Sequence, residues 1–218
     1  MRYTLSQQIS VTADTQRSAV NRYKAAVDLL TARNGWIRMA EALSAGISRR
    51  TLYLLRDNGV IEQVSRGVYR LSGLPSLSQP DKTVVALRVP HAVVCLTSAL
   101  SFHEITTQIP SAVDIAVLTG TTIPRISYPP IRIYRLREPS FGAGITEHLI
   151  DGVTIKIYDV EKTLCDCFKF RGQLGMDVVL EALRLYHERK PLKITNLMKY
   201  ARACRVEKII HPYLEAML

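Results

Sequence analysis

The chain has 218 residues, of which 47% are hydrophobic, which is enough to bury a core and argues against global disorder. Its formal net charge is +10, which favours a polyanionic partner such as DNA, RNA or an anionic membrane. Residues 1–80 hold 11 basic against 5 acidic side chains, so the excess is densest in the N-terminal third. No apolar run approaches the roughly 20 residues of a transmembrane helix, and the N-terminus lacks the apolar centre of a signal peptide, so we expect a cytoplasmic protein with no membrane partner.

The first part of the chain predicts an irregular arm over residues 1–13, followed by two helices. The first helix is expected over about 16–33, where apolar residues repeat at helical spacing. A short extended link then contains Trp36, the single tryptophan of the sequence, which we expect in the core. Residues 38–45 predict the second helix.

Residues 48–57 predict a third, short helix with a basic outer face. Ser48 is a good N-cap because its hydroxyl can accept a backbone N–H of the first turn, and Asn58-Gly59 ends the helix. At about 100° per residue, the inner side carries Thr51, Leu52, Leu54 and Leu55. The outer side carries Arg49, Arg50, Tyr53, Arg56 and Asp57. Arginine forks bind guanine edges or phosphates bidentately, as the second helix of a helix-turn-helix requires.

Residues 60–71 predict a β-hairpin with a basic tip. Ser65-Arg66-Gly67 is a tight-turn signal between two runs of strand-forming residues. A hairpin directly after such a helix is a wing, and Arg66 could reach a narrow minor groove or a phosphate. Each feature alone also fits solvated surface, but their order predicts a winged helix-turn-helix DNA-binding domain over residues 14–71. Its expected DNA contacts are Arg38, Ser48, Arg49, Arg50, Thr51, Tyr53, Arg56 and Arg66.

The second part of the chain predicts a separate domain. The Ser- and Pro-rich residues 72–80 indicate a linker, and residues 81–218 predict a mixed α/β domain with a mostly antiparallel sheet and a helical C-terminal end. The fold class is therefore α+β. Strands are expected at 92–96, 112–118, 131–136, 145–150 and 153–158, the last two joined by Asp151-Gly152, and helices at 160–169, 175–189, 193–203 and 206–217.

Signals for catalysis or metal binding are weak, and we expect no enzyme activity, no catalytic residues, no metal and no cofactor. The four cysteines, Cys95, Cys165, Cys167 and Cys204, lack the spacing of a zinc site and are expected to be reduced packing residues.

A DNA-targeted nuclease with a winged-helix delivery domain is the alternative. It would need Asp114 with either the 151–156 segment or Glu161-Lys162 to hold a metal, and neither pair has the right spacing. Asp114-Ile115-Ala116 also lacks the second carboxylate of a nucleotidyltransferase.

The predicted strand 131–136 carries Arg132 on one face and Arg135 on the other, and Arg137 follows directly after it. These arginines are either solvated side chains of a half-buried strand or a second contact for a polyanion, either flanking DNA or an RNA.

Three segments carry a resemblance to a known family. They are SRRTLYLLRDNGVIEQVSRGVYRL at 48–71, HAVVCLTSALSFHEI at 91–105 and DVEKTLCDCF at 159–168. With these segments the sequence resembles the AbiEi family, the antitoxins of the type IV toxin–antitoxin systems that act in abortive infection, a phage defence.

The resemblance implies a winged-helix domain followed by an α/β antitoxin domain. It implies a repressor that binds inverted repeats of double-stranded DNA in its own promoter, with more than one copy on the DNA. It also implies an antitoxin that neutralises a nucleotidyltransferase-like toxin without a stable complex. By position, the DNA-contacting role falls on Arg49, Arg50, Tyr53, Arg56 and Arg66, and the family offers no catalytic residues.

Overall fold

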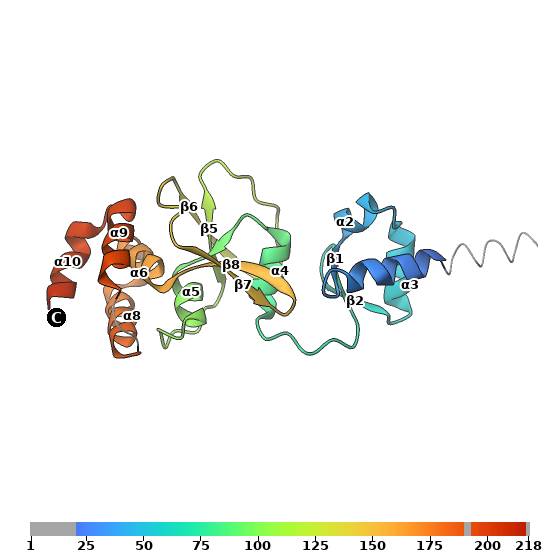
Figure 1. Cartoon of the computed structure of the whole chain (residues 1–218), viewed down its shortest axis with the longest axis horizontal. Helices are drawn as coiled ribbons and strands as arrows, with labels where there is room; N and C mark the ends of the chain where they lie inside the picture. Colours follow the sequence, from blue (N-terminus) through green and yellow to red (C-terminus); the bar gives the residue numbers. More distant parts are fainter. Residues whose placement is uncertain (1–20, 190–192, 217–218) are drawn as a thin grey trace, which may run out of the picture. The chain divides into compact units, whose positions relative to one another are not determined.

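The computed structural model describes residues 21–189 and 193–216, and the chain divides into two compact units after Ser78 (Figure 1). The predicted arm at 1–13 and the start of the first predicted helix lie outside the described residues. Together the units contain helices, an antiparallel sheet and a mixed sheet, so the α+β class is confirmed. None of the helices in the described parts is long and apolar enough to cross a membrane.

The N-terminal unit combines helices with a three-stranded antiparallel sheet of order β1-β3-β2. Residues 21–31 are helical, so the first helix ends two residues earlier than predicted. The named elements are α2 (Met39–Ser44), α3 (Arg49–Asp57), β1 (Trp36–Arg38), β2 (Ile61–Ser65) and β3 (Val68–Leu71).

The sheet of this unit is larger than the sequence indicated. The hairpin of β2 and β3 forms as predicted, and Gly67 takes a φ of 74° in its turn, a conformation that glycine adopts without strain. The predicted extended link around Trp36 instead forms β1, which pairs with β3 from Trp36 opposite Arg70 to Arg38 opposite Val68. Arg38, predicted as the first residue of the second helix, therefore belongs to this strand. Three residues are too short for a period-2 pattern, so only the pairing partner reveals this strand.

The core of the N-terminal unit lies between the inner side of α3, the first helix and the sheet. Its buried residues include Leu30, Ile37, Ala42, Leu52, Leu55, Ile61 and Tyr69. Trp36 is buried, as predicted. Leu54 was expected on the inner side but is 39% exposed, because the contact surface of this short helix is narrower than the predicted stripe.

The C-terminal unit is built on a five-stranded sheet of order β6-β5-β4-β8-β7. The prediction that this sheet is mostly antiparallel is wrong, since β4–β8 and β5–β6 are parallel pairs and only β4–β5 and β7–β8 are antiparallel. Parallel pairing needs a long connection between the strands, and a sequence does not specify the direction in which such a connection returns. The strands are β4 (Val93–Val94), β5 (Val113–Leu118), β6 (Ile131–Leu136), β7 (Ile145–Ile150) and β8 (Val153–Tyr158).

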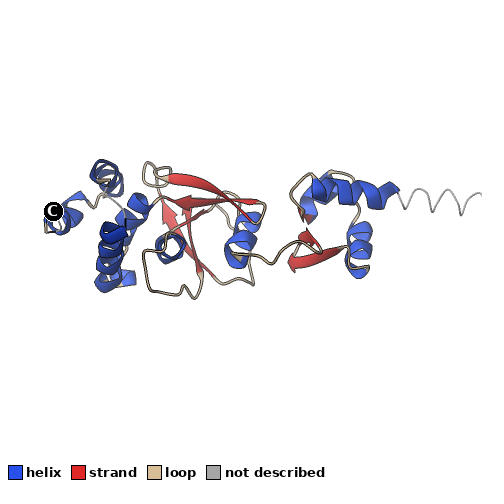
Figure 2. Ribbon diagram, turned by 60° about the horizontal axis from the view of Figure 1, so that its bottom comes forward, coloured by secondary structure: helices blue, strands red, loops and turns tan. Residues whose placement is uncertain are grey.

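Helices cover both sides of this sheet, and Figures 1 and 2 show α6, α8, α9 and α10 gathered on one side of it with α4 at the other. Helix α6 is the centre of the C-terminal core and is buried from Val160 to Phe168. Asp159 caps it by accepting the N–H of Lys162 at 2.8 Å. The helices are α4 (Pro80–Arg88), α5 (Leu96–Phe102), α6 (Val160–Lys169), α7 (Arg171–Leu174), α8 (Met176–Arg189), α9 (Ile194–Cys204) and α10 (Glu207–Glu215).

The four cysteines are free thiols buried in this unit, as predicted. Burial raises the pKa of the Cys165 thiol far above its ordinary value, and desolvation also raises the pKa of Cys204. Both thiols are therefore uncharged packing groups at neutral pH.

Candidate nucleic-acid interface

Helix α3 begins at a hydroxyl cap. Ser48 is extended, and its Oγ accepts the N–H of Thr51 at 3.1 Å. The hydroxyl of Thr51 lies 3.0 Å from the same Oγ, and Thr51 is only 7% exposed. Ser48 and Thr51 therefore fix the start of the helix, and Thr51 faces inward rather than toward a partner.

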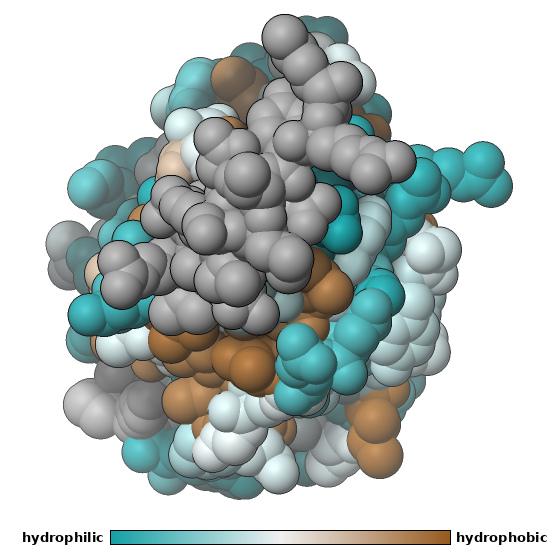
Figure 3. Space-filling model, turned by 90° about the vertical axis from the view of Figure 1, so that its right-hand side faces the viewer, coloured by the Kyte–Doolittle hydropathy of each residue, from teal (hydrophilic) through white to brown (hydrophobic). Residues whose placement is uncertain are grey.

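The outward face of α3 carries four large side chains that are open to solvent: Arg49, Arg50, Tyr53 and Arg56. Leu52 and Leu55 anchor the opposite face in the core. Figure 3 views the molecule from the side of its N-terminal unit, where hydrophilic side chains border a hydrophobic area. Three guanidinium groups thus project from one rigid helix, because its inner face is packed.

Arg56 is held in a local cluster at the C-terminal end of α3. Its Nε and Nη2 donate to the same carboxylate oxygen of Asp57, at 2.9 and 2.8 Å, and its guanidinium lies 5.1 Å from the centroid of the Tyr53 ring. In the part of the chain that the structure describes, Arg49 and Arg50 form no ion pair with an acidic group. The N-terminal half of the helix therefore presents the more available charge.

Arg38 is oriented by an acidic residue of α2. The Glu41 carboxylate accepts the backbone N–H of Arg38 at 2.9 Å and its guanidinium at 2.7 Å. Arg33 lies 3.2 Å from the same carboxylate. The hydrogen bond from Arg38 is the main cause of the lowered pKa of Glu41, so this carboxylate stays ionised and holds Arg38 in place.

The two arginines of the hairpin have different environments. Arg66 occupies the turn and is exposed. Arg70 is 6% exposed: its guanidinium lies 5.5 Å from the Trp36 ring centroid, pairs with Glu62 at 3.1 Å and donates to the backbone carbonyl of Pro75. Sequence reasoning gave Arg70 no role, because its partner on β1 appears only once that strand is paired.

The comparisons with known proteins give one family for this unit. The model that matches describes a transcriptional regulator, AbiEi antitoxin. Residues 25–72 match the AbiEi antitoxin family. The matched segment contains α2, α3 and the hairpin, and it confirms the family resemblance drawn from residues 48–71. It covers less than half of the chain, and the resemblances at 91–105 and 159–168 stay predictions.

Other comparisons add little. Among solved structures, the chain is similar to the crystal structure of RV2827C protein from Mycobacterium tuberculosis, with 12% identity over 86% of this chain and 78% of that one and a TM-score of 0.47. No curated protein matches the chain.

Outside the AbiEi-type segment, the three arginines predicted on or directly after one strand are not brought together. Arg132 donates to the Ser111 hydroxyl at 2.8 Å and lies 3.6 Å from the buried Asp114 carboxylate on β5. Burial raises the pKa of Asp114, and the Arg132 guanidinium opposes that shift. Arg135 and Arg137, further along the chain, line a pocket whose lining does not include Arg132.

The acidic residues of the nuclease alternative are also separate. Asp114 pairs with Arg132, Asp151 accepts the backbone N–H of Gln79 at 3.2 Å, and Glu161 accepts the hydroxyl of Tyr186. Over residues 21–189 and 193–216, no group of three or more His, Cys, Asp or Glu side chains could hold a metal ion. No specific observation therefore favours metal-dependent cleavage.

Proposed function

We propose that this protein is a DNA-binding autorepressor and antitoxin, in which residues 14–71 act as a winged helix-turn-helix. The observation that carries the proposal is the outward face of α3, where Arg49, Arg50 and Arg56 project from a helix anchored by Leu52 and Leu55. In this arrangement α3 enters the major groove of double-stranded DNA, and the β2–β3 hairpin acts as the wing.

The proposed DNA contacts fall into two groups. Arg49 and Arg50 read base edges or bind phosphates bidentately at the N-terminal end of the helix. Arg38, held by Glu41, and Arg66, in the hairpin turn, bind the backbone or the minor groove. Several such contacts make the affinity fall steeply with salt, and inverted repeats recruit more than one copy.

The family matched at residues 25–72 is that of an antitoxin and transcriptional regulator, which supports an antitoxin role for the protein in general. We propose that the C-terminal unit performs this role. We propose that the toxin is nucleotidyltransferase-like and that it is neutralised without a stable complex, so that repression and protection are separable activities of the two units.

The first experiment titrates the full-length protein against the DNA upstream of its own reading frame and measures fluorescence anisotropy at several salt concentrations. The variant Arg49→Ala/Arg50→Ala should lose about 1–3 kcal/mol per base-reading arginine. The matched control Arg184→Ala/Lys208→Ala removes the same charge from exposed positions of the C-terminal unit. Equal affinity in the α3 variant and the control would refute the assignment of α3.

A second experiment tests protection separately. The proposed nucleotidyltransferase-like toxin is induced in cells that carry the wild-type protein or the Arg49→Ala/Arg50→Ala variant. We expect the variant to lose promoter repression but to keep protection against the toxin. Loss of protection in a variant that accumulates normally would show that the two roles are not divided between the units.

A further inference from the structure

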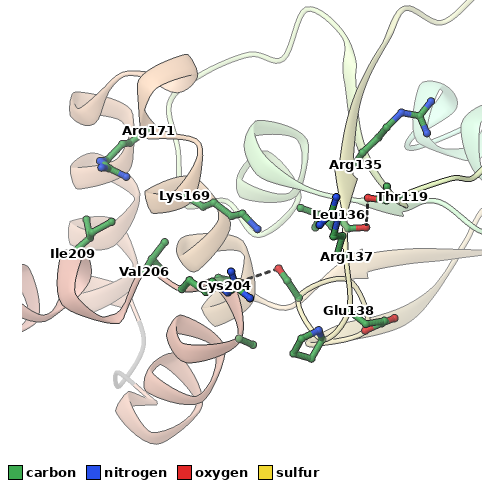
Figure 4. Close-up of a pocket in the computed structure, with 14 residues that line it drawn as sticks. Thr119, Arg135, Leu136, Arg137, Glu138, Lys169, Arg171, Cys204, Val206 and Ile209 are labelled. Atoms are coloured by element: carbon green, nitrogen blue, oxygen red, sulfur yellow. Dashed lines mark hydrogen bonds between the residues drawn. The ribbon is translucent and has the colours of Figure 1, made fainter.

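One concave site of the C-terminal unit is a pocket of about 660 Å³ (Figure 4). It is formed by the end of β6 and the loop after it, the C-terminal end of α6 with α7, and the corner between α9 and α10. Its charged lining residues are Arg135, Arg137, Glu138, Lys169, Arg171 and Arg205. These residues come from three separate segments of the chain, so only folding brings them together.

The pocket has an uncompensated positive charge. Glu138 is its single acidic lining residue, and its carboxylate accepts the backbone N–H of Gly142 at 3.1 Å. Within the described residues, none of the five cationic side chains forms an ion pair with an acidic group. Like charges gathered in a concave site repel one another, and a bound anion would relieve that repulsion.

Helix ends account for part of this charge but not for all of it. Lys169 ends α6, and Arg205 follows α9, where each helix terminus carries roughly half a negative charge. Arg135 points away from the other labelled cations in Figure 4 and donates to the Thr121 carbonyl at 2.9 Å. Arg171 donates to the Phe168 carbonyl at 2.8 Å. With Arg135 and Arg171 set aside, and with Glu138 and both helix ends subtracted, an excess of about one positive charge remains.

Two cations show how the site is built. Figure 4 shows the Lys169 side chain extending from the end of α6 toward β6. Arg205 has a φ of 61° at the left-handed position that ends α9, where glycine or asparagine is usual. An arginine therefore occupies a position where the backbone favours a residue without a long side chain.

We propose that this pocket binds the phosphate groups of a nucleoside polyphosphate. The volume is that of a small-molecule site rather than of a flat face for a duplex. Several separate cations match a chain of phosphates, whereas Pro139 and Ile209 supply an apolar part of the lining for a base. The proposal goes beyond the DNA-binding role and does not depend on it.

The test measures binding of fluorescently labelled GTP to the full-length protein by anisotropy, with unlabelled GTP and ATP as competitors. We expect saturable binding with a Kd below about 1 mM. The variant Arg137→Gln/Lys169→Gln should weaken it at least ~10-fold. The variant Arg184→Gln/Lys208→Gln, with the same charge change, and Arg49→Ala/Arg50→Ala should both bind like the wild type. Absence of saturable binding, or equal loss in the control, would overturn the proposal.

A single substitution separates binding from folding. Arg205→Gly removes a lining cation and places the residue with the least strain at the left-handed position, so it should leave the thermal midpoint unchanged or raise it while weakening GTP binding. Unchanged GTP affinity in this variant and in Arg137→Gln/Lys169→Gln would show that this pocket is not the GTP-binding site.

Competitors identify the source of the phosphates. Displacement of GTP by inorganic pyrophosphate supports recognition of the phosphate groups. Displacement by single-stranded RNA with a 5′-triphosphate indicates that an RNA end supplies these phosphate groups. If only duplex DNA displaces the probe, and the pocket variant abolishes that displacement, the pocket is a DNA-backbone contact and the proposal is wrong.

Discussion

Arg70 of β3 lies over the indole of Trp36 on the neighbouring strand β1, with its guanidinium carbon 5.5 Å from the ring centroid. The same side chain pairs with Glu62 of β2. One buried cation thus links all three strands of the N-terminal sheet. Four residues earlier, Arg66 occupies the exposed turn of the same hairpin. The hairpin therefore contains one structural arginine and one that faces solvent.

We expect Arg70→Ala to destabilise the N-terminal unit by about 2–3 kcal/mol, because a hydrogen-bonded, largely buried cation and its contact with an aromatic ring are both lost. The fluorescence of Trp36, the single tryptophan of the sequence, follows denaturation of this unit specifically. Arg66→Ala is the matched control, and its stability should stay within ~0.5 kcal/mol of the wild type. For its DNA binding, the slope of the logarithm of the binding constant against the logarithm of salt concentration should be shallower by about 1. Equal destabilisation by both substitutions would contradict the distinction.

Ser48 should act as a helix cap before it acts as a DNA contact. Ser48→Ala removes the acceptor for the Thr51 N–H and should cost about 1 kcal/mol by Trp36 fluorescence. Ser48→Asp keeps an acceptor at the cap and should retain stability, but it should weaken DNA binding because it adds a negative charge beside Arg49. A stable, fully binding Ser48→Ala protein would exclude both roles.

Asp57 should limit the affinity of α3 for DNA. Its carboxylate holds Arg56 through two hydrogen bonds and repels phosphates. Asp57→Asn should therefore raise DNA affinity about 2- to 5-fold. If Arg56 gains a phosphate contact, the slope of the logarithm of the binding constant against the logarithm of salt concentration should become steeper by about 1. Asp28→Asn makes the same charge change at an exposed position of the first helix and serves as the control. The same gain in both variants would indicate a general charge effect instead.

Replacing only one member of the Lys162–Asp166 ion pair should destabilise the C-terminal unit more than replacing both. The two side chains are fully buried and 2.5 Å apart, and Lys162 also lies 4.1 Å from the Tyr158 ring centroid. Lys162→Met strands a buried carboxylate and should cost about 3–5 kcal/mol. Lys162→Met/Asp166→Leu should recover most of that stability in denaturant titrations followed by circular dichroism. A double variant as unstable as the single one would argue against a coupled pair.

Asp114 should make the stability of the C-terminal unit depend on pH. Burial raises its pKa, so the folded state holds this proton more tightly than the unfolded chain. Its contribution to stability therefore decreases as pH rises from the ordinary value of about 3.9 up to the raised value in the folded protein. Asp114→Asn should lack this decrease, so its stability relative to the wild type should rise across that window and stay constant above it. A pH-independent difference would contradict the raised pKa.

The sequence by itself determined the features that depend on neighbouring residues. The cap at Ser48, the stop at Asn58-Gly59 and the hairpin around Asp151-Gly152 rest on local hydrogen bonds and on backbone angles that glycine adopts without strain. The strands 131–136, 145–150 and 153–158 and the helix 160–169 were predicted with their observed bounds. The arginine face of α3 followed in the same way from helical periodicity.

Only the tertiary structure decided how distant segments pair. It formed β1 against β3, made β5 and β6 parallel, and buried Arg70 while exposing Arg66. It also joined Arg137, Lys169 and Arg205 around one pocket. These outcomes depend on burial and on contacts between residues far apart in the chain, which local propensity does not encode.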